Sequence, residues 1–155
     1  MLKLLILLLL TFLTLIFSSG DSNKIKNIDN KNFDSVVKSS NEIWVVEIGS
    51  KMCGSCAEFL PEFESVAKEF ISINFGITNI DNPEGMKLVQ NFDGVLDEGV
   101  PSVLIFYNEN NDWKFVVAGK VVKRNELKNL LKSMTRNMKS SANGKLLKQA
   151  QNEDL

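Results

Sequence analysis

The chain has few of the residues that bind metals. It contains 155 residues, no histidine and only two cysteines, Cys53 and Cys56. A structural zinc site normally takes four nitrogen or sulfur ligands, so a single chain cannot build one of the usual kind. An Asn-x-Ser/Thr sequon for N-glycosylation is also missing. We therefore expect no metal site within one chain, which leaves the cysteine pair as the main candidate for chemistry.

Neither sign of charge dominates the chain. It carries 18 basic and 19 acidic residues, a formal net charge of −1. Without the leader described below, which contains Lys3, 17 basic residues face 19 acidic ones, a net charge of −2. This balance gives no basis for a nucleic-acid partner. The basic residues are concentrated near the end, because nine of them and a single acid, Glu126, lie between Lys120 and Lys148.

The first apolar run is too short to cross a membrane. It extends from Leu4 to Phe17, whereas a spanning helix needs about 20 residues. Lys3 precedes it and the small residues Ser18-Ser19-Gly20 follow it, a pattern typical of a cleaved secretory signal. We expect residues 1–20 to be a signal peptide, with an uncleaved signal anchor as the alternative.

The remaining chain is long enough for one domain with a sizeable hydrophobic core. We assign this domain to residues 21–138. Residues 139–155 are small, polar and charged, so we expect them to form a disordered tail. The tail ends in Asn152-Glu153-Asp154-Leu155, which resembles the K-D-E-L address of the endoplasmic reticulum but has asparagine first and the two acids exchanged.

Both cysteines lie where a predicted strand passes into a predicted helix. The run from Ile43 to Ile48 is short, β-branched and aromatic, as in a buried strand, and it ends at the turn Gly49-Ser50. After the cysteines, apolar residues recur at spacings of three and four, which predicts an amphipathic helix. These residues are Phe59, Leu60, Phe63, Val66, Ala67 and Phe70.

This position favours thiol chemistry. Unpaired backbone N–H groups and the helix dipole at a helix N-terminus lower a cysteine pKa from about 8.5 toward roughly 3.5–7.5. Cys53 comes first and should be the exposed attacking thiol, whereas Cys56 should face the core. Residues three apart on a helix have Cβ atoms roughly 5–6 Å apart, which a small adjustment brings within disulfide reach. Because so short a loop constrains little unfolded-chain entropy, a redox-active pair is favoured over an inert disulfide.

These residues resemble the thioredoxin family. The strand, the turn, the Cys-x-x-Cys motif and Pro61 in the following helix match its pattern. Glu47, six residues before the first cysteine, stands where that family has a buried carboxylate. Together with Trp44-Val45-Val46 it is most similar to the catalytic domains of protein disulfide isomerases. Gly99-Val100-Pro101-Ser102 resembles the family's cis-proline loop, and the resemblance covers roughly Asn27 to Met138.

The resemblance implies an α/β thioredoxin-like fold, with a central mixed β-sheet of four to five strands flanked by helices on both faces. It also implies residue roles. Cys53 would form a mixed disulfide with a client protein, Cys56 would resolve it, and Glu47 would exchange a proton with Cys56. The expected substrate-binding residues are Met52, Gly54, Ser55, Val100 and Pro101, and the bond before Pro101 should be cis.

Several positions depart from the family's pattern. Met52 replaces the usual tryptophan and keeps an apolar rim of adaptable shape. Gly54-Ser55 is neither the Gly-Pro of reducing thioredoxins nor the Gly-His of typical isomerases, so a thiolate-stabilising histidine is missing. The lysine that pairs with the buried carboxylate would fall near Ile77, so Glu47 should lack a cation and have a raised pKa. Asp97-Glu98, just before the proline loop, should oppose thiolate formation.

The rest of the chain predicts alternating strands and helices. Asp29 can cap a helix, and the acids and glycines from Asp93 to Gly99 predict a loop. On the last helix basic residues recur every four positions, which either a solvated face or an acidic partner would explain. The predicted elements are a short strand near Ile25 and Ile28, a helix from Asn30 to Lys38, a strand within Ile71 to Ile80, a helix from Pro83 to Phe92, a hairpin of Val103 to Tyr107 with Trp113 to Val117, and a helix from Asn125 to Met138.

We interpret the chain as a thiol–disulfide oxidoreductase or protein disulfide isomerase that acts on cysteines of client proteins. The Cys53–Cys56 disulfide would be its only redox group, with no added cofactor, and glutathione or a redox-recycling protein would restore it. We expect a monomer in the endoplasmic reticulum lumen, or alternatively a secreted protein, with no nucleic acid and no stable membrane insertion. A non-enzymatic client-binding module on the same scaffold is the competing interpretation. Two chains that share a metal or an iron–sulfur cluster through their cysteine pairs are a third.

Overall fold

The structure of the chain is a computed structural model that describes residues 25–149. The predicted signal peptide, residues 1–20, and the four C-terminal residues that resemble a retention address lie outside the described part. The domain boundaries assigned from the sequence therefore stay predictions. None of the helices between residues 25 and 149 combines the length and the hydrophobicity that crossing a membrane requires.

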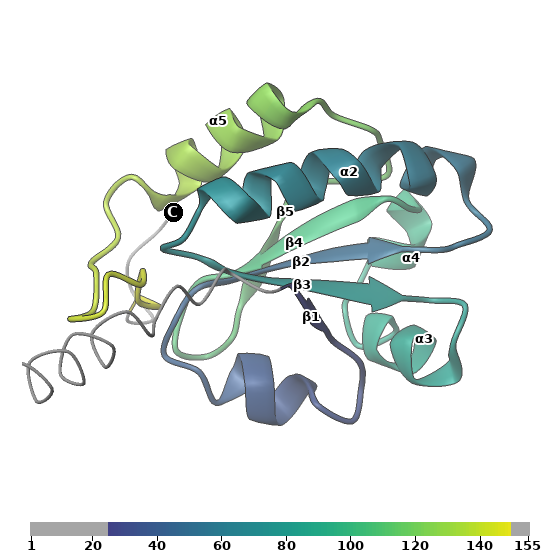
Figure 1. Ribbon diagram of the computed structural model, residues 1–155. Coiled ribbons are helices and arrows are strands. Elements are labelled where there is room, and N and C mark those ends of the chain that lie inside the picture. Colours follow the sequence, from purple (N-terminus) through teal and green to yellow (C-terminus); the bar gives the residue numbers. More distant parts are fainter. Residues whose placement is uncertain (1–24, 150–155) are drawn as a thin grey trace, which may run out of the picture.

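Five strands form one mixed sheet at the centre of the molecule, in the order β1-β3-β2-β4-β5 (Figure 1). β1, β3 and β2 run parallel, whereas β4 and β5 are each antiparallel to the strand before them in this order. The predicted α/β fold with a mixed sheet of four to five strands is confirmed. The strands are β1 (Lys26–Asn27), β2 (Trp44–Gly49), β3 (Asn74–Asn79), β4 (Ser102–Phe106) and β5 (Trp113–Val117).

β2 is the central strand, and all six of its residues are buried. Because both faces of the sheet are covered, this strand is a continuous apolar run rather than an alternating one. Its side chains still alternate in direction: Trp44, Val46 and Ile48 join one core cluster, and Val45 joins the other. Glu47 therefore points to the same face as Val45.

Helices cover both faces of the sheet. α2 (Gly54–Glu69) and α5 (Arg124–Thr135) lie side by side over one face, where their apolar residues join the same core cluster as Val45 (Figure 1). The helical turn η1 (Asp34–Lys38) and α3 (Pro83–Val89) cover the other face. The short α4 (Val95–Glu98) leads toward β4.

The predicted helices are present with different ends. The helix predicted from Asn30 begins as a turn, in which Asp29 Oδ1 accepts the N–H groups of Lys31 and Asn32, and continues as the wide π-helical turn η1. α3 ends at Val89 rather than Phe92, and α5 ends at Thr135 rather than Met138. The predicted loop from residue 93 to residue 99 contains α4, which shows that four residues suffice for one helical turn there.

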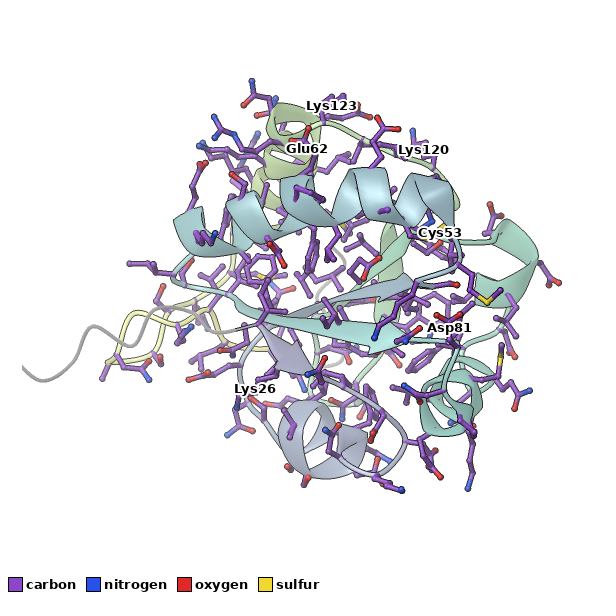
Figure 2. The ribbon with its side chains drawn as sticks, turned by 45° about the vertical axis from the view of Figure 1, so that its right-hand side comes forward. Lys26, Cys53, Glu62, Asp81, Lys120 and Lys123 are labelled. Atoms are coloured by element: carbon purple, nitrogen blue, oxygen red, sulfur yellow. A yellow bond between two sulfur atoms is a disulfide. The ribbon has the colours of Figure 1, made fainter. Side chains whose placement is uncertain are left out.

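Glutamates of α2 bind basic residues at the start of α5. Lys123 Nζ lies 3.8 Å from Glu62 Oε1, a pair that Figure 2 labels, and Arg124 Nη1 lies 3.5 Å from Glu69 Oε1. Lys128 Nζ also binds Glu69. Two of the basic positions that recur along the last helix, Arg124 and Lys128, thus have an acidic partner within the same chain. The pairs are largely exposed, so they orient the two helices more than they stabilise the fold.

Part of the predicted tail packs against the domain, so the expectation of disorder is wrong for residues 139–149. The N–H of Leu146 donates to Ser72 O at 2.8 Å, and Leu146 O accepts the N–H of Ile43 at 2.9 Å. The segment then continues to the hairpin of β4 and β5, where further backbone hydrogen bonds hold it. The polar composition of the segment predicted disorder, but composition does not reveal whether a segment forms backbone hydrogen bonds with distant residues.

Candidate active site

The Cys53–Cys56 disulfide lies at the start of α2. Cys53 is the N-cap residue with extended backbone, and the two Cα atoms are 5.2 Å apart. The N–H of Cys56 donates to Cys53 Sγ at 3.1 Å. The first sulfur thus contacts a backbone donor at the positive end of the helix, as the sequence predicts. Figure 2 shows this sulfur where the chain enters α2.

The two cysteines differ in exposure. Cys53 is half-buried, whereas Cys56 is 3% exposed and faces the core. Gly54 and Ser55 between them are exposed, and Met52 before them is 91% exposed. Ser55 Oγ lies 3.1 Å from Cys53 Sγ, and because a disulfide sulfur carries no proton the hydroxyl is the donor. Cys53 is therefore the accessible sulfur, while the catalytic roles of the pair stay predictions.

The predicted proline loop contacts the disulfide. The Val100-Pro101 peptide bond is cis, as the resemblance implies, and Pro101 is buried. Val100 O lies 3.7 Å from Cys53 Sγ, although 47 residues separate them in the chain. Ser102 Oγ donates to Gly99 O at 2.7 Å, which closes the loop at the start of β4. The fold thus brings together two segments that the sequence places far apart.

Two acids precede this loop. Asp97 and Glu98 are exposed residues of α4, and the helix ends directly at Gly99. Gly99 has a φ of +84°, a conformation that favours glycine, and it turns the chain toward Val100. The two carboxylates therefore precede the loop that contacts Cys53, and the expectation that their charge opposes a thiolate stays a prediction.

Glu47 is a buried carboxyl without a charged partner. It is 4% exposed and lies between Ile77 of β3 and Val103 of β4 in the register of the sheet. Burial removes water from the carboxyl and raises its pKa to about 7, and no cation in the described part of the chain offsets this. The residue beside it in β3 is the apolar Ile77, near which the family's lysine would fall.

Glu47 and Cys56 face the same cavity, which has a volume of about 510 Å³. Ile77 and Thr78 of β3 line one side of it, and the first turns of α2 line another. Gly49 leaves the space open, because a Cβ at this position would lie 2.5 Å from Glu47 Oε1. The carboxyl and the buried sulfur thus border one space, through which water can carry a proton between them.

The sequence analysis missed two residues that hold the loop before Cys53. Asp81 accepts the Ser50 hydroxyl at 2.6 Å and the N–H of Lys51 at 2.7 Å. Ser50 Oγ in turn accepts the N–H of Met52 at 3.0 Å. The hydrogen bonds from Ser50 and then Lys51 hold the pKa of Asp81 below its usual value. Figure 2 shows Asp81 at the same end of the molecule as Cys53.

Strand order is the signal that would have revealed Asp81. β2 and β3 are parallel neighbours, so their C-terminal ends lie at the same edge of the sheet. Ser50 directly follows β2, and Asp81 lies two residues beyond Asn79 at the end of β3. In the sequence, Asp81 only follows the strand predicted within Ile71 to Ile80, and nothing there pairs this strand with the one before Ser50.

The fold is that of thioredoxin-like proteins, and known proteins agree with this. The chain belongs to the thioredoxin family, because the family model for thioredoxin matches residues 24–135. A crystal structure of chloroplastic thioredoxin z superposes with a TM-score of 0.56 at 16% identity and covers 71% of this chain and 93% of that one. At this identity the likeness concerns the fold.

The chain is also similar to single domains of protein disulfide isomerases. It is 27% identical over 100 residues to protein disulfide-isomerase like 2-2 of Arabidopsis thaliana, a match that covers 59% of this chain and 21% of that protein. It is 33% identical over 76 residues to protein disulfide-isomerase 2-3 of the same plant, covering 48% of this chain and 16% of the relative. The chain thus spans about a fifth of the length of the relatives it matches.

Proposed function

We propose that this protein is a thiol–disulfide oxidoreductase of the protein disulfide isomerase kind, acting on cysteines of client proteins. One observation carries the proposal: an accessible sulfur, Cys53, is linked to a buried one, Cys56, at the start of a helix and beside a cis-proline loop. The similarity to single domains of protein disulfide isomerases supports it.

The exchange begins at Cys53. In the reduced protein its thiolate attacks one sulfur of a client disulfide, forms a mixed disulfide and releases the other client sulfur as a thiolate, which takes up a proton. The Cys56 N–H and the Ser55 hydroxyl already contact this sulfur in the disulfide form. In the reduced form the same donors would stabilise the thiolate. The exchange requires no cofactor beyond the Cys53–Cys56 pair.

Resolution requires a thiolate at Cys56. Glu47, with a pKa of about 7, is suited to take the proton of Cys56 and to return it near neutral pH. The Cys56 thiolate then attacks Cys53 Sγ, which forms the intramolecular disulfide and releases the second client sulfur. One turnover oxidises the protein dithiol to a disulfide and reduces the client disulfide to two thiols. Run in reverse, the same steps introduce a disulfide into a client.

Clients would bind across Met52 and the proline loop. Val100 O lies 3.7 Å from Cys53 Sγ, so a client backbone that pairs with Val100-Pro101 would place its cysteine against Cys53. Met52 offers an exposed and flexible apolar contact. The exposed Gly54 and Ser55 leave room for the client chain beside the disulfide.

The proposal includes a cellular setting, for which two sequence motifs are the reason. The leader of residues 1–20 would direct the chain into the secretory pathway, and the last four residues favour retention in the endoplasmic reticulum lumen over secretion. There the protein would act as a monomer, and glutathione or a recycling protein would reset the Cys53–Cys56 pair. Deleting the last four residues should raise the amount of protein in the medium; unchanged secretion would mean that they are no address.

A dithiol turnover assay on the purified protein tests the proposed activity. The protein should catalyse exchange with a disulfide-containing client peptide, Cys53→Ser should abolish it, and Cys56→Ser should trap the mixed disulfide. Glu47→Gln should slow resolution of the mixed disulfide more than its formation, because only resolution needs a thiolate at Cys56. Equal slowing of both steps would remove Glu47 from proton transfer.

The alternative is a module that binds clients without turning them over. Asp97 and Glu98 beside the proline loop favour it, because their charge disfavours the Cys53 thiolate. Binding of a client peptide that is unchanged in Cys53→Ser, together with no turnover, would establish this alternative. For an active protein the reduction potential gives the direction: near about −270 mV it would reduce clients, and near about −180 mV it would isomerise or oxidise them.

A further inference from the structure

The cavity beside Glu47 has the size of a ligand site. Its volume of about 510 Å³ falls within the range of roughly 300–1,000 Å³ that small-molecule sites occupy. Ile28, Leu60 and Ile77 give it apolar sides, and the loop residues after β2 and β3 give it a polar side. The exchange described above uses this space only as a path for one proton, which leaves most of it without an assigned role.

The polar side of the cavity carries more negative than positive groups. The carboxyls of Glu47 and Asp29 line it, against the single cation Lys51, which is exposed. Asp29 is already engaged, because its Oδ1 accepts the N–H of Lys31 at 2.9 Å. β3 brings no titratable group to the cavity, and α2 brings only Cys56, which does not titrate as a disulfide.

Glu47 is the buried carboxyl of this cavity, and in the part of the chain that the structure describes no hydrogen bond or ion pair engages it. The residue is 4% exposed, and its neighbours across the sheet, Ile77 and Val103, are apolar. The missing side chain of Gly49 leaves the carboxyl free to face the cavity, because a Cβ there would lie 2.5 Å from Oε1. A buried carboxylate in this position is costly unless a cation or several donors contact it.

We propose that this cavity binds the ammonium or guanidinium group of an aliphatic cation, with the Glu47 carboxylate as its counter-charge. The ligand is a free amine or a lysine or arginine side chain of a client. Its head would form a charge-assisted hydrogen bond with Glu47, and its alkyl stem would pack on Leu60 and Ile77. A neutral ligand of the same shape would leave the carboxylate unpaired and should bind more weakly.

Such a ligand would also tune the exchange. By linkage, a cation that prefers the charged carboxyl lowers the pKa of Glu47, and the cation in turn binds better as Glu47 loses its proton. A carboxylate held in its charged form cannot return a proton to Cys56. This consequence rests on the proposed function, whereas the binding itself does not.

Binding is measured on the oxidised protein, where no turnover occurs. The probes are n-butylammonium and its neutral counterpart n-butanol, titrated at pH 5 and pH 8 while the chemical shift of the Glu47 carboxyl carbon is followed by NMR. At pH 8 the cation should bind at least tenfold more tightly than the alcohol. At pH 5, where Glu47 is protonated, the cation should lose at least tenfold in affinity.

Three variants test whether the two probes bind in this cavity. Glu47→Gln should abolish both the preference for the cation and its pH dependence, and Ala57→Leu should weaken both probes by filling the space while the Glu47 charge remains. Glu109→Gln, which removes an exposed acid from the loop between β4 and β5, should bind both probes as the unchanged protein does. Equal binding of the two probes, or cation binding that survives Glu47→Gln, would overturn the proposal.

A further experiment with two peptides distinguishes the two sources of the cation. An unstructured peptide with a central lysine is compared with the same peptide carrying norleucine. If the lysine peptide binds more tightly than n-butylammonium, the ligand is a client side chain; if it binds no better, the ligand is a free amine. Because turnover is assayed separately, loss of one proposal leaves the other standing.

Discussion

Glu47 and Asp81 are two carboxyls near one disulfide, and the fold shifts their pKa values in opposite directions. Burial removes water from Glu47 and raises its pKa to about 7. Asp81 is exposed, and hydrogen bonds from Ser50 and Lys51 hold its pKa below the usual value. The residue type is nearly the same, so the difference comes from position: one residue lies within the central strand and the other just beyond the end of its neighbour. Only Glu47 is left able to exchange a proton near neutral pH.

The stability of the protein should report the state of Glu47. Its folded pKa, about 7, lies above the unfolded value of 4.5, so the folded state binds more protons between these values and stability falls as the pH rises through this window. Glu47→Gln removes the cost of the buried charge. It should raise the free energy of unfolding at pH 8 by up to about 3 kcal/mol and change little at pH 5.

Denaturant unfolding of both proteins at the two pH values measures this difference. Glu109→Gln serves as the control, because an exposed acid should give no pH-dependent change. A Glu47→Gln protein that is destabilised equally at pH 5 and pH 8 would show that the carboxyl is paired in the fold.

Accessibility should separate the two thiols in the reduced protein. Cys53 is half-buried beside exposed neighbours, whereas Cys56 is 3% exposed beneath the first turn of α2. Limited alkylation with iodoacetamide, followed by peptide mass spectrometry, should therefore label Cys53 first and by at least tenfold. Faster labelling of Cys56 would reverse the assigned roles.

At the scale of elements, the site is assembled from the ends of three strands. β2 delivers the cysteines, β4 begins at the proline loop, and β3 delivers Asp81. The parallel pairing of β2 with β3 brings Asp81 to Ser50, 31 residues away in the chain. These contacts fix the backbone of Lys51 and Met52, so the entry into α2 is held before any client binds.

Removing the hydrogen bond between Ser50 and Asp81 and neutralising the Asp81 carboxylate should shift the pKa of Cys53 in opposite directions. Ser50→Ala keeps the Asp81 charge but frees the N–H of Met52, so Cys53 aligns less well with the helix start and its pKa should rise. Asp81→Asn can still accept the N–H of Lys51 but removes a negative charge, so the pKa of Cys53 should fall.

The pH dependence of the alkylation rate measures both shifts. Asp34→Asn, which neutralises an exposed acid of η1 on the opposite face of the sheet, is the matched control and should leave the pKa of Cys53 unchanged. Shifts of the same sign in Ser50→Ala and Asp81→Asn would show that both substitutions disorder the loop before Cys53 in a nonspecific way, instead of acting through the Ser50–Asp81 hydrogen bond and the Asp81 charge.

At the scale of the whole molecule, residues 139–149 close the fold. They pair with the loops before β2 and β3 and reach the hairpin of β4 and β5. Lys148 anchors the segment: its Nζ donates to Val37 O at 2.7 Å and also binds Asn111. No carboxylate pairs with it in the part of the chain that the structure describes, and burial lowers its pKa to about 8.

Removing residues 139–155 should therefore destabilise the domain, by about 1–3 kcal/mol from the lost hydrogen bonds and packing. The difference should depend on pH. The folded pKa of Lys148, about 8, lies below the unfolded value of 10.5, so the folded state binds fewer protons between them and stability rises with pH across this window. The free energy of unfolding of the full chain, relative to that of the shortened chain, should therefore increase between pH 7.5 and pH 10.

Urea unfolding of the two chains at these two pH values is the measurement. Lys148→Met in the full chain should remove this increase in stability with pH while keeping most of the packing of residues 139–149. Identical midpoints for the full and shortened chains would mean that the segment contributes nothing to the fold.

The sequence by itself determined the class of fold and the centre of the site. The run ending at Ile48, the Cys53–Cys56 spacing and the Val100-Pro101 loop are local patterns, and local patterns encode strands, helix starts and turns. Glu47 was found through the resemblance to the thioredoxin family, which has a buried carboxylate six residues before the first cysteine. The element types were right for the same reason, while their ends shifted by a few residues because hydrogen bonding at helix ends depends on neighbours outside the helix.

Only the tertiary structure decided what lies around these residues. Asp81 and Ser50 meet because β2 and β3 are parallel neighbours, the cavity exists because β3 and the first turns of α2 border one space beside Glu47, and residues 139–149 are ordered by pairing with distant backbone. Each of these depends on contacts between residues far apart in the chain. Such contacts form only once the strands have taken their order in the sheet, and no local pattern in this sequence specifies which strands become neighbours.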